Sequence, residues 1–171
     1  MSITADDAFR AYGRVMAKVG ALEQYMRIAL LEHEQSRCAS KGRGHDDLER
    51  YVVKVMKYTF GALLQQVHDK YKLGPAFLDT LKEVKSFRDY LAHEFWVAYF
   101  PALRTERGRK IIIEHCALYE RSFDRVGDVF VAQSGLDITP YITSLDREAT
   151  SESRLAGWEA RLQGHVPTEA I

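Results

Sequence analysis

The chain has 171 residues, enough for one domain with its own hydrophobic core. Its residues are 46% hydrophobic and 28% charged, as in ordinary globular proteins, and 24 basic side chains balance 24 acidic ones. Because nucleic-acid-binding domains usually carry excess positive charge, this balance argues against a broad basic surface and restricts any contact with RNA to a local patch.

Apolar residues three and four positions apart predict a first helix from Thr4 to about Arg37. Thr4 is a suitable N-terminal cap, and Asp6 and Asp7 suit the first turn, where the helix dipole favours acidic side chains. The stretch that follows, residues 36–47, is polar and contains two glycines. It predicts a loop between two helices.

A second helix is expected to begin at residues 46–47 and to run to Tyr71. Gly74 suits the C-terminal cap of this helix, and Pro75 suits the first turn of the next one. We expect the third helix to continue until Pro101, because proline lacks the N–H that a helix interior needs.

Residues 102–109 predict a connecting loop, and a fourth helix is expected over 110–133, with Gly135 ending it. The three isoleucines at 111–113 would also suit a strand, but a single strand has no partner elsewhere in the chain. The pattern therefore predicts an all-α fold, a four-helix up-and-down bundle over residues 1–135.

The character of the sequence changes in residues 136–171, where apolar residues are sparser. A short helix is expected between residues 144 and 163, although the polar stretch "TSES" interrupts it. We interpret this C-terminal extension as a partly helical appendage that packs on the bundle or on a partner.

Several common enzyme classes lack their motifs in this sequence. "HEFWV", at 93–97, begins like a zinc-protease motif but lacks the second histidine, and no Glu-x-x-His pair offers a di-iron site. "KGRGHDD", at 41–47, is not a phosphate-binding loop, and no Gly-x-Ser-x-Gly elbow is present. We therefore expect no metal ion and no cofactor.

Signals for a membrane or for secretion are also missing. No stretch approaches the roughly 18 consecutive apolar residues of a membrane span. The first ten residues carry acids where a signal peptide needs a basic and then an apolar run, and Cys38 and Cys116 follow no metal or redox spacing. These features predict a cytoplasmic protein with reduced thiols and no membrane contact.

The stretch "RDYLAH", at 88–93, is the one candidate for a catalytic motif. It places Arg88 and Asp89 before His93, near the end of the expected third helix. This pattern resembles the signature of the HEPN superfamily, which is an arginine, four to six residues and a histidine, often with a polar residue after the arginine. "YTFGALLQQV", at 58–67, also resembles a stretch of that family, and the resemblance covers about residues 5–133.

The resemblance implies an all-helical, metal-independent endoribonuclease, in some members a toxin that an antitoxin protein neutralises. It also implies a two-fold homodimer that brings two Arg–His sets into one cleft, here through the third helix. A two-fold axis doubles any residue near it, so such a dimer is physically economical. RNA is then the expected ligand.

The residue types suit that chemistry without reference to a family. Asp89 and His93 are four apart on a helix, so the carboxylate can hold the imidazole and favour its protonated form. Arg88 and His93 are about 140° apart around the helix, but a long arginine can reach towards the helix end. A histidine can move protons on the 2′-OH or the 5′-oxygen while a cation stabilises the phosphorane. The alternative is an ordinary solvated helix stripe, in which Lys85–Asp89 is an equally good four-apart pair.

Two further features could contact RNA. Trp96 lies one turn beyond the motif and could stack on a base, although aromatic residues at helical spacing are more often core. Residues 104–110 hold four basic side chains that could bind phosphate or simply form a solvated loop: Arg104, Arg107, Arg109 and Lys110.

A second functional hypothesis needs no catalysis. A helical dimer of the same fold can serve as an adaptor or as a transcriptional-regulator-like interaction module. The neutral net charge and the C-terminal extension favour this interpretation. Arg88 and His93 would then stabilise the dimer or bind a small anion.

Overall fold

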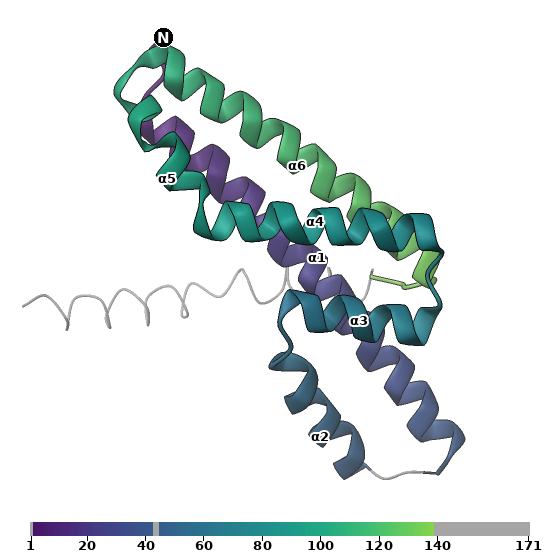
Figure 1. The fold of residues 1–171 in the computed structure, drawn as a ribbon. Coiled ribbons are helices and arrows are strands. Elements are labelled where there is room, and N and C mark those ends of the chain that lie inside the picture. The colour runs from purple at the N-terminus through teal and green to yellow at the C-terminus, as the bar shows by residue number, and fades with distance from the viewer. Residues whose placement is uncertain (1, 43–44, 139–171) are drawn as a thin grey trace, which may run out of the picture. The chain divides into compact units, whose positions relative to one another are not determined.

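A computed structural model describes residues 2–42 and 45–138, and this part of the chain is entirely helical in its regular structure, which confirms the predicted all-α class. Its helices all belong to one compact unit, Met1–Leu136. In chain order (Figure 1) they are α1 (Ala5–Ser40), α2 (His45–Met56), α3 (Phe60–Tyr71), α4 (Pro75–His93), α5 (Phe95–Tyr99), the 3-10 helix η1 (Phe100–Arg104) and α6 (Glu106–Ser134). The helix expected between residues 144 and 163 lies outside the described residues.

Helix α1 begins as the sequence predicts. The Thr4 hydroxyl accepts a hydrogen bond from the Asp7 amide, and the Asp7 carboxylate accepts one of 2.9 Å from the Thr4 amide. Each side chain thus satisfies one N–H that the first turn leaves free. The helix continues past Arg37 and ends at Ser40.

Helices α1 and α6 lie side by side and run in the same direction (Figure 1). The residue numbers of the contacting pairs increase along both segments: Ile3 contacts Glu106, Arg14 contacts Glu120, and Lys18 contacts Asp124. A four-helix up-and-down bundle would make its first and last helices antiparallel. The predicted topology is therefore not the one observed, although α4 does run antiparallel to α1.

The expected second helix is in fact two helices, because the chain breaks between Met56 and Phe60. Thr59 adopts an extended conformation, and its hydroxyl accepts a hydrogen bond of 3.3 Å from the amide of Ala62. A threonine that caps a new helix competes with continuation of the old one. The position of the next break also differs from expectation: Lys72, at φ 51°, caps α3, whereas Gly74 precedes Pro75 in α4.

The expected third helix ends earlier than Pro101. Helix α4 stops at His93, α5 follows, and Pro101 lies within the short η1 helix. The Tyr12 hydroxyl donates a 2.8 Å hydrogen bond to the carbonyl of Leu91, in the last turn of α4. That bond satisfies a carbonyl that a continuing helix would use.

Helix α6 begins four residues before the expected position. Thr105 caps it by accepting a 3.0 Å hydrogen bond from the Gly108 amide. Residues 111–113 are helical, not extended, and Gly135, at φ 65°, ends the helix as predicted. Glycine suits this left-handed position because it has no Cβ to clash.

The core runs between α1, α6 and the shorter helices. Its fully buried large side chains are apolar: Val15, Leu22, Met26, Leu30, Val55, Leu63, Val67, Leu81, Leu91, Phe95, Ile112 and Phe130. The apolar residues of α1, the longest helix, form the common surface on which α2, α3 and α6 pack.

Candidate functional site

Arg88 and Asp89 line a polar cleft of about 430 Å³ where α1, the turn before α3, and α4 meet. We call it the arginine cleft. It is lined by Glu23, Arg27, Tyr58, Thr59, Phe60, Gly61, Lys85, Arg88 and Asp89. The sequence motif therefore lies partly in a recess of the surface to which α1 and α4 contribute charged side chains.

Glu23 holds the two arginines of the cleft. One oxygen of its carboxylate lies 3.2 Å from Arg27 Nη2, and the other lies 3.5 Å from Arg88 Nη2. The carboxylate is 17% exposed, so water screens these ion pairs less than it would on an open surface. Arg27 and Arg88 are thereby fixed side by side although 60 residues separate them in the chain.

Asp89 pairs with cations of its own helix. Its carboxylate accepts a 2.5 Å hydrogen bond from Lys85 Nζ and a 3.3 Å bond from Arg88 Nη1. The hydrogen bond from Lys85, followed by the charges of Lys85 and Arg88, lowers the pKa of Asp89 below its usual value. The expected contact with His93 is not among these bonds, so in this structure Asp89 orients the cations rather than the imidazole.

His93 is the last residue of α4 and is exposed. No hydrogen bond or ion pair joins its imidazole ring to another residue in the described ranges 2–42 and 45–138. Its backbone is held two residues upstream, where Tyr12 bonds to Leu91. The histidine therefore projects from an anchored helix end with its ring nitrogens accessible to a ligand or to a partner.

Trp96 packs against other aromatic rings. Its ring centroid lies 4.8 Å from that of Phe9, 4.9 Å from that of Tyr12 and 5.2 Å from that of Phe95. It remains partly exposed. These contacts favour the core interpretation of Trp96 over base stacking.

The basic residues at 104–110 differ in their contacts. Arg109 donates hydrogen bonds of 2.6 Å to the Ile3 carbonyl and 2.8 Å to the Leu103 carbonyl, which ties the start of α6 to the N-terminal segment. Lys110 lies 3.9 Å from Glu114, whereas Arg104 and Arg107 are exposed. None of the four lines the arginine cleft.

Sequence reasoning missed Glu23, Arg27 and Gly61 as members of the cleft. Glu23 and Arg27 are four apart on α1 and could have been recognised as an ion pair, but nothing in the sequence places that pair against Arg88. Gly61 belongs to the family-like stretch at 58–67, yet its role is steric: a Cβ there would lie 3.2 Å from Lys85 Cε.

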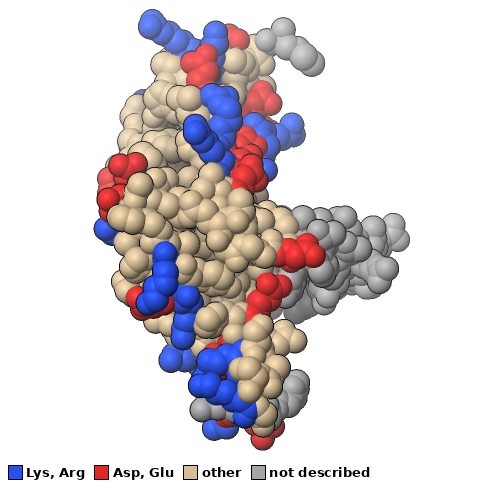
Figure 2. All heavy atoms as spheres, turned by 90° about the vertical axis from the view of Figure 1, so that its right-hand side faces the viewer, with Lys and Arg blue, Asp and Glu red and all other residues tan. Residues whose placement is uncertain are grey.

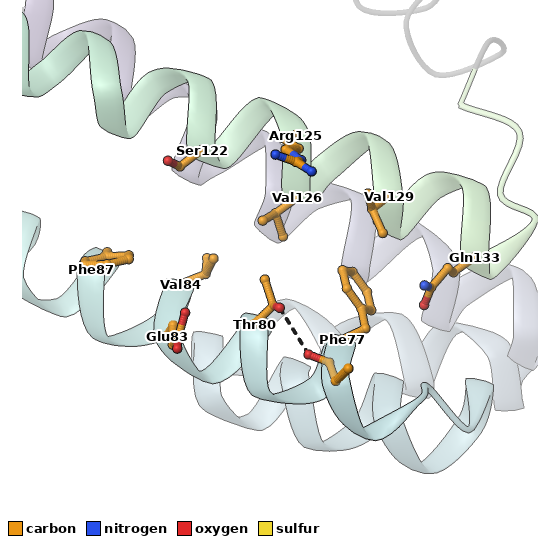
Figure 3. Close-up of a pocket in the computed structure, with 11 residues that line it drawn as sticks. Phe77, Thr80, Glu83, Val84, Phe87, Ser122, Arg125, Val126, Val129 and Gln133 are labelled. Atoms are coloured by element: carbon orange, nitrogen blue, oxygen red, sulfur yellow. Dashed lines mark hydrogen bonds between the residues drawn. The ribbon is translucent and has the colours of Figure 1, made fainter.

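A second recess lies between α4 and α6 and has a volume of about 530 Å³. Figure 3 shows side chains from both helices along it, with Phe77 and Val84 on α4 and Val126 and Val129 on α6. Phe87, also on its wall, is 43% exposed and contacts Tyr119 at a ring-centroid distance of 5.6 Å. We call this recess the α4–α6 groove.

The charge distribution agrees with the neutral composition. On the face that Figure 2 shows, basic and acidic side chains are interspersed, and an uncharged region lies between them. No helix in the described part of the chain is long and apolar enough to cross a membrane. Within the same residues, no group of three or more His, Cys, Asp or Glu side chains is placed to hold a metal ion.

The arginine cleft and the exposed His93 are thus the two features of the candidate site. Neither the family models, nor the curated proteins, nor the solved structures with which the chain was compared include a match.

Proposed function

We propose that the protein is a metal-independent endoribonuclease of HEPN type. The observation that carries this proposal is that Arg88 lines a cationic cleft while His93, five residues later on the same helix, is exposed and free of partners among the described residues. A fixed cation and an accessible imidazole on one helix are the two groups that RNA self-cleavage requires.

In the proposed reaction the 2′-oxygen of a ribose attacks the adjacent phosphorus, and the bond to the 5′-oxygen of the next nucleotide breaks. The 2′-hydroxyl loses its proton and the leaving 5′-oxygen gains one, so the products are a 2′,3′-cyclic phosphate and a 5′-hydroxyl. His93 moves one of these protons, and Arg88 stabilises the charge on the phosphorane. Asp89 positions Arg88 and Lys85, as its hydrogen bonds indicate.

One histidine can perform only one of the two proton transfers at a time. We therefore propose that the active form is a homodimer through α4, in which a two-fold axis brings two copies of His93 to one RNA strand. An antitoxin protein that covers His93 would block the reaction, which makes a toxin–antitoxin or phage-defence role the proposed biological setting.

The test is incubation of the purified protein with total RNA in EDTA, followed by analysis of the fragment ends. We expect fragments with 2′,3′-cyclic phosphate ends, and a rate at least about a hundredfold lower for His93→Ala. The matched control is His33→Ala, because His33 is also partly exposed but contacts Tyr71, outside the cleft lining. Full activity of a folded His93→Ala protein would contradict the assignment.

The α4–α6 groove favours the second candidate, a non-catalytic dimer that acts as an adaptor or regulator module. Its apolar wall includes the exposed Phe87, and Glu83 and Arg125 stand on opposite sides of it. In a two-fold interface every contact between the two copies occurs twice, so Glu83 of each copy can pair with Arg125 of the other. The groove is therefore complementary to a second copy of this chain.

Sedimentation of the protein tests the dimer that this candidate needs. Phe87→Glu would place a charge in the apolar contact and is expected to convert the dimer to a monomer. Val53→Glu, on the exposed side of α2, is the matched control and should leave the dimer intact. A monomeric parent protein would contradict the dimer in both candidate functions, whereas a dimer that cleaves no RNA would favour the module.

A further inference from the structure

We infer that the arginine cleft is a binding site for the phosphate group of a nucleotide, in which Arg27, Lys85 and the first turn of α3 act together with Arg88. This inference goes beyond the proposed function, because it assigns a ligand to residues outside the Arg–His motif. It also holds if the protein cleaves no RNA.

The balance of charge in the cleft is the first argument. Arg27, Lys85 and Arg88 bring three positive charges to the lining, and Glu23 and Asp89 bring two negative ones. A recess with one uncompensated positive charge attracts an anion more strongly than an open surface does, because its walls reduce screening by water.

Two buried donors without acceptors are the second argument. Arg27 Nε and Arg88 Nε are both inaccessible to solvent and make no hydrogen bond within residues 2–42 and 45–138. Arg88 Nε lies 3.5 Å from Glu23 as an ion pair, but the geometry is not that of a hydrogen bond. A buried N–H left unsatisfied costs free energy. A small shift of the two side chains towards the cleft would expose these donors, and the oxygens of a phosphate could then accept from both guanidinium groups.

The start of α3 provides the third argument. Thr59 caps only the Ala62 amide, so the amides of Phe60 and Gly61 lack an acceptor within the helix. Phe60 and Gly61 both line the cleft. The N-terminus of a helix favours a phosphate because its free amides and its dipole both attract negative charge.

Gly61 and Lys85 complete the site. The Lys85 stem passes so close to α3 that a Cβ at position 61 would lie 3.2 Å from its Cε and 3.8 Å from its Cδ. Glycine therefore lets the ammonium group of Lys85 reach the same region as the α3 amides. A Cβ at position 61 would force the lysine stem to shift by a few tenths of an ångström.

The size of the cleft indicates a ligand larger than an isolated ion. Its volume of about 430 Å³ lies within the range of small-molecule sites, about 300–1,000 Å³. Tyr58 also lines it, and an aromatic ring can pack against a base or sugar. The chemistry shared by a free mononucleotide and an RNA strand, a phosphate ester on a nucleoside, is thus the ligand class.

The test measures binding by titration calorimetry to the His93→Ala protein, so that cleavage cannot obscure it. The ligands are inorganic phosphate, adenosine 5′-monophosphate, adenosine, and a short oligoribonucleotide. We expect the monophosphate to bind and adenosine not to bind. Arg27→Gln should weaken the affinity about tenfold or more, since a charged hydrogen bond is lost.

Arg50→Gln is the matched control, because Arg50 also pairs with an acid on its own helix but is exposed and outside the cleft. Gly61→Ala should weaken binding as well without removing a charge, and it replaces Arg27→Gln if that variant fails to fold. Binding unchanged in these cleft variants, or no binding of any phosphate ligand, would overturn the inference. Stronger binding of the oligoribonucleotide than of the monophosphate would identify RNA as the source, and the reverse would identify a free nucleotide.

The outcome is separable from that of the proposed function. Phosphate binding without RNA cleavage by the parent protein would retain the cleft assignment and reject the ribonuclease. Cleavage that depends on His93 but is unaffected by Arg27→Gln and Gly61→Ala would retain the ribonuclease and reject the cleft assignment.

Discussion

The hydroxyl of Tyr12 on α1 donates a 2.8 Å hydrogen bond to the carbonyl of Leu91 in the last turn of α4. Helix α4 ends two residues later, at His93. Tyr12 is in turn packed against Phe95 and Trp96, with ring-centroid distances of 5.1 Å and 4.9 Å. The end of the helix that carries the candidate histidine is therefore fixed by a side chain from the first helix.

Tyr12→Phe is expected to lower the free energy of unfolding by about 1 kcal/mol, because it removes the donor and leaves the Leu91 carbonyl unsatisfied. Urea denaturation measures this change. Tyr25→Phe is the matched control, since the Tyr25 hydroxyl makes no hydrogen bond within the described part of the chain. Equal effects of the two substitutions would show that the bond contributes nothing.

The same bond shows why the end of α4 could not be predicted from the sequence. The two residues are 79 positions apart, so nothing near "RDYLAH" indicates that the helix stops there. By contrast, the start of α1 at Thr4 and the end of α6 at Gly135 were predicted correctly. Both depend on local chemistry, a side-chain cap and a left-handed glycine.

The residues of the candidate site also divide into those that the sequence predicts and those that depend on tertiary packing. The motif identified Arg88 and His93, but Asp89 has a cation four residues before it and a histidine four residues after it. Helical spacing alone cannot choose between these partners, and the structure pairs Asp89 with Lys85. Arg27 could not be assigned to the site either, because only tertiary packing places α1 beside α4.

Gly108→Ala is expected to destabilise the fold strongly. A Cβ at position 108 would lie 2.1 Å from the carbonyl oxygen of Ala102, and because that atom is backbone, η1 and α6 would have to separate. We expect a loss of about 2 kcal/mol or more in the free energy of unfolding, measured in urea.

Gly20→Ala is the control for that substitution. Gly20 lies inside α1, and a Cβ there would meet no atom within 4 Å. Alanine is the better helix former, so this variant should gain about 0.5–1 kcal/mol. Destabilisation of similar size in both variants would contradict the steric explanation.

The ion pair of Glu34 and Arg37 predicts a loss of stability in acid. Glu34 is buried, and its hydrogen bonds from Arg37 lower its pKa below the usual 4.5, against the opposing effect of burial. A carboxyl whose pKa is lower in the folded state stabilises the fold above the unfolded pKa. That contribution disappears as the pH falls through the folded pKa.

The measurement is the free energy of unfolding between pH 3 and pH 6, for the parent protein and for Glu34→Gln. We expect the difference between the two proteins to shrink as the pH falls below about 4.5. Glu114→Gln is the control, because the Glu114–Lys110 pair is exposed and 3.9 Å apart and should change the curve little. A difference that does not vary with pH would show that the charge of Glu34 is unimportant.

Asp89→Asn tests whether Asp89 orients Lys85 and Arg88 or orients His93. The substitution raises the formal charge of the arginine cleft by one, and the ion pairs that it removes are partly exposed and contribute little to stability. If the structure describes the working arrangement, phosphate and RNA should bind about twofold to fivefold more tightly at low salt. The kcat for RNA cleavage should then fall by less than about tenfold, because Glu23 still holds Arg88 when Asp89 no longer positions it. If Asp89 orients His93 in the bound state, kcat should instead fall by a factor of about 100 or more.

Asp79→Asn is the matched control for this experiment, because Asp79 lies on the same helix, pairs with Lys82 and is outside the cleft lining. It changes the net charge by the same amount, so any effect of overall charge on RNA binding appears equally in both variants. Only a difference between the two reports on the cleft itself. Tighter binding in Asp89→Asn alone, lost in 0.5 M salt because ions then screen the added charge, is the expected result.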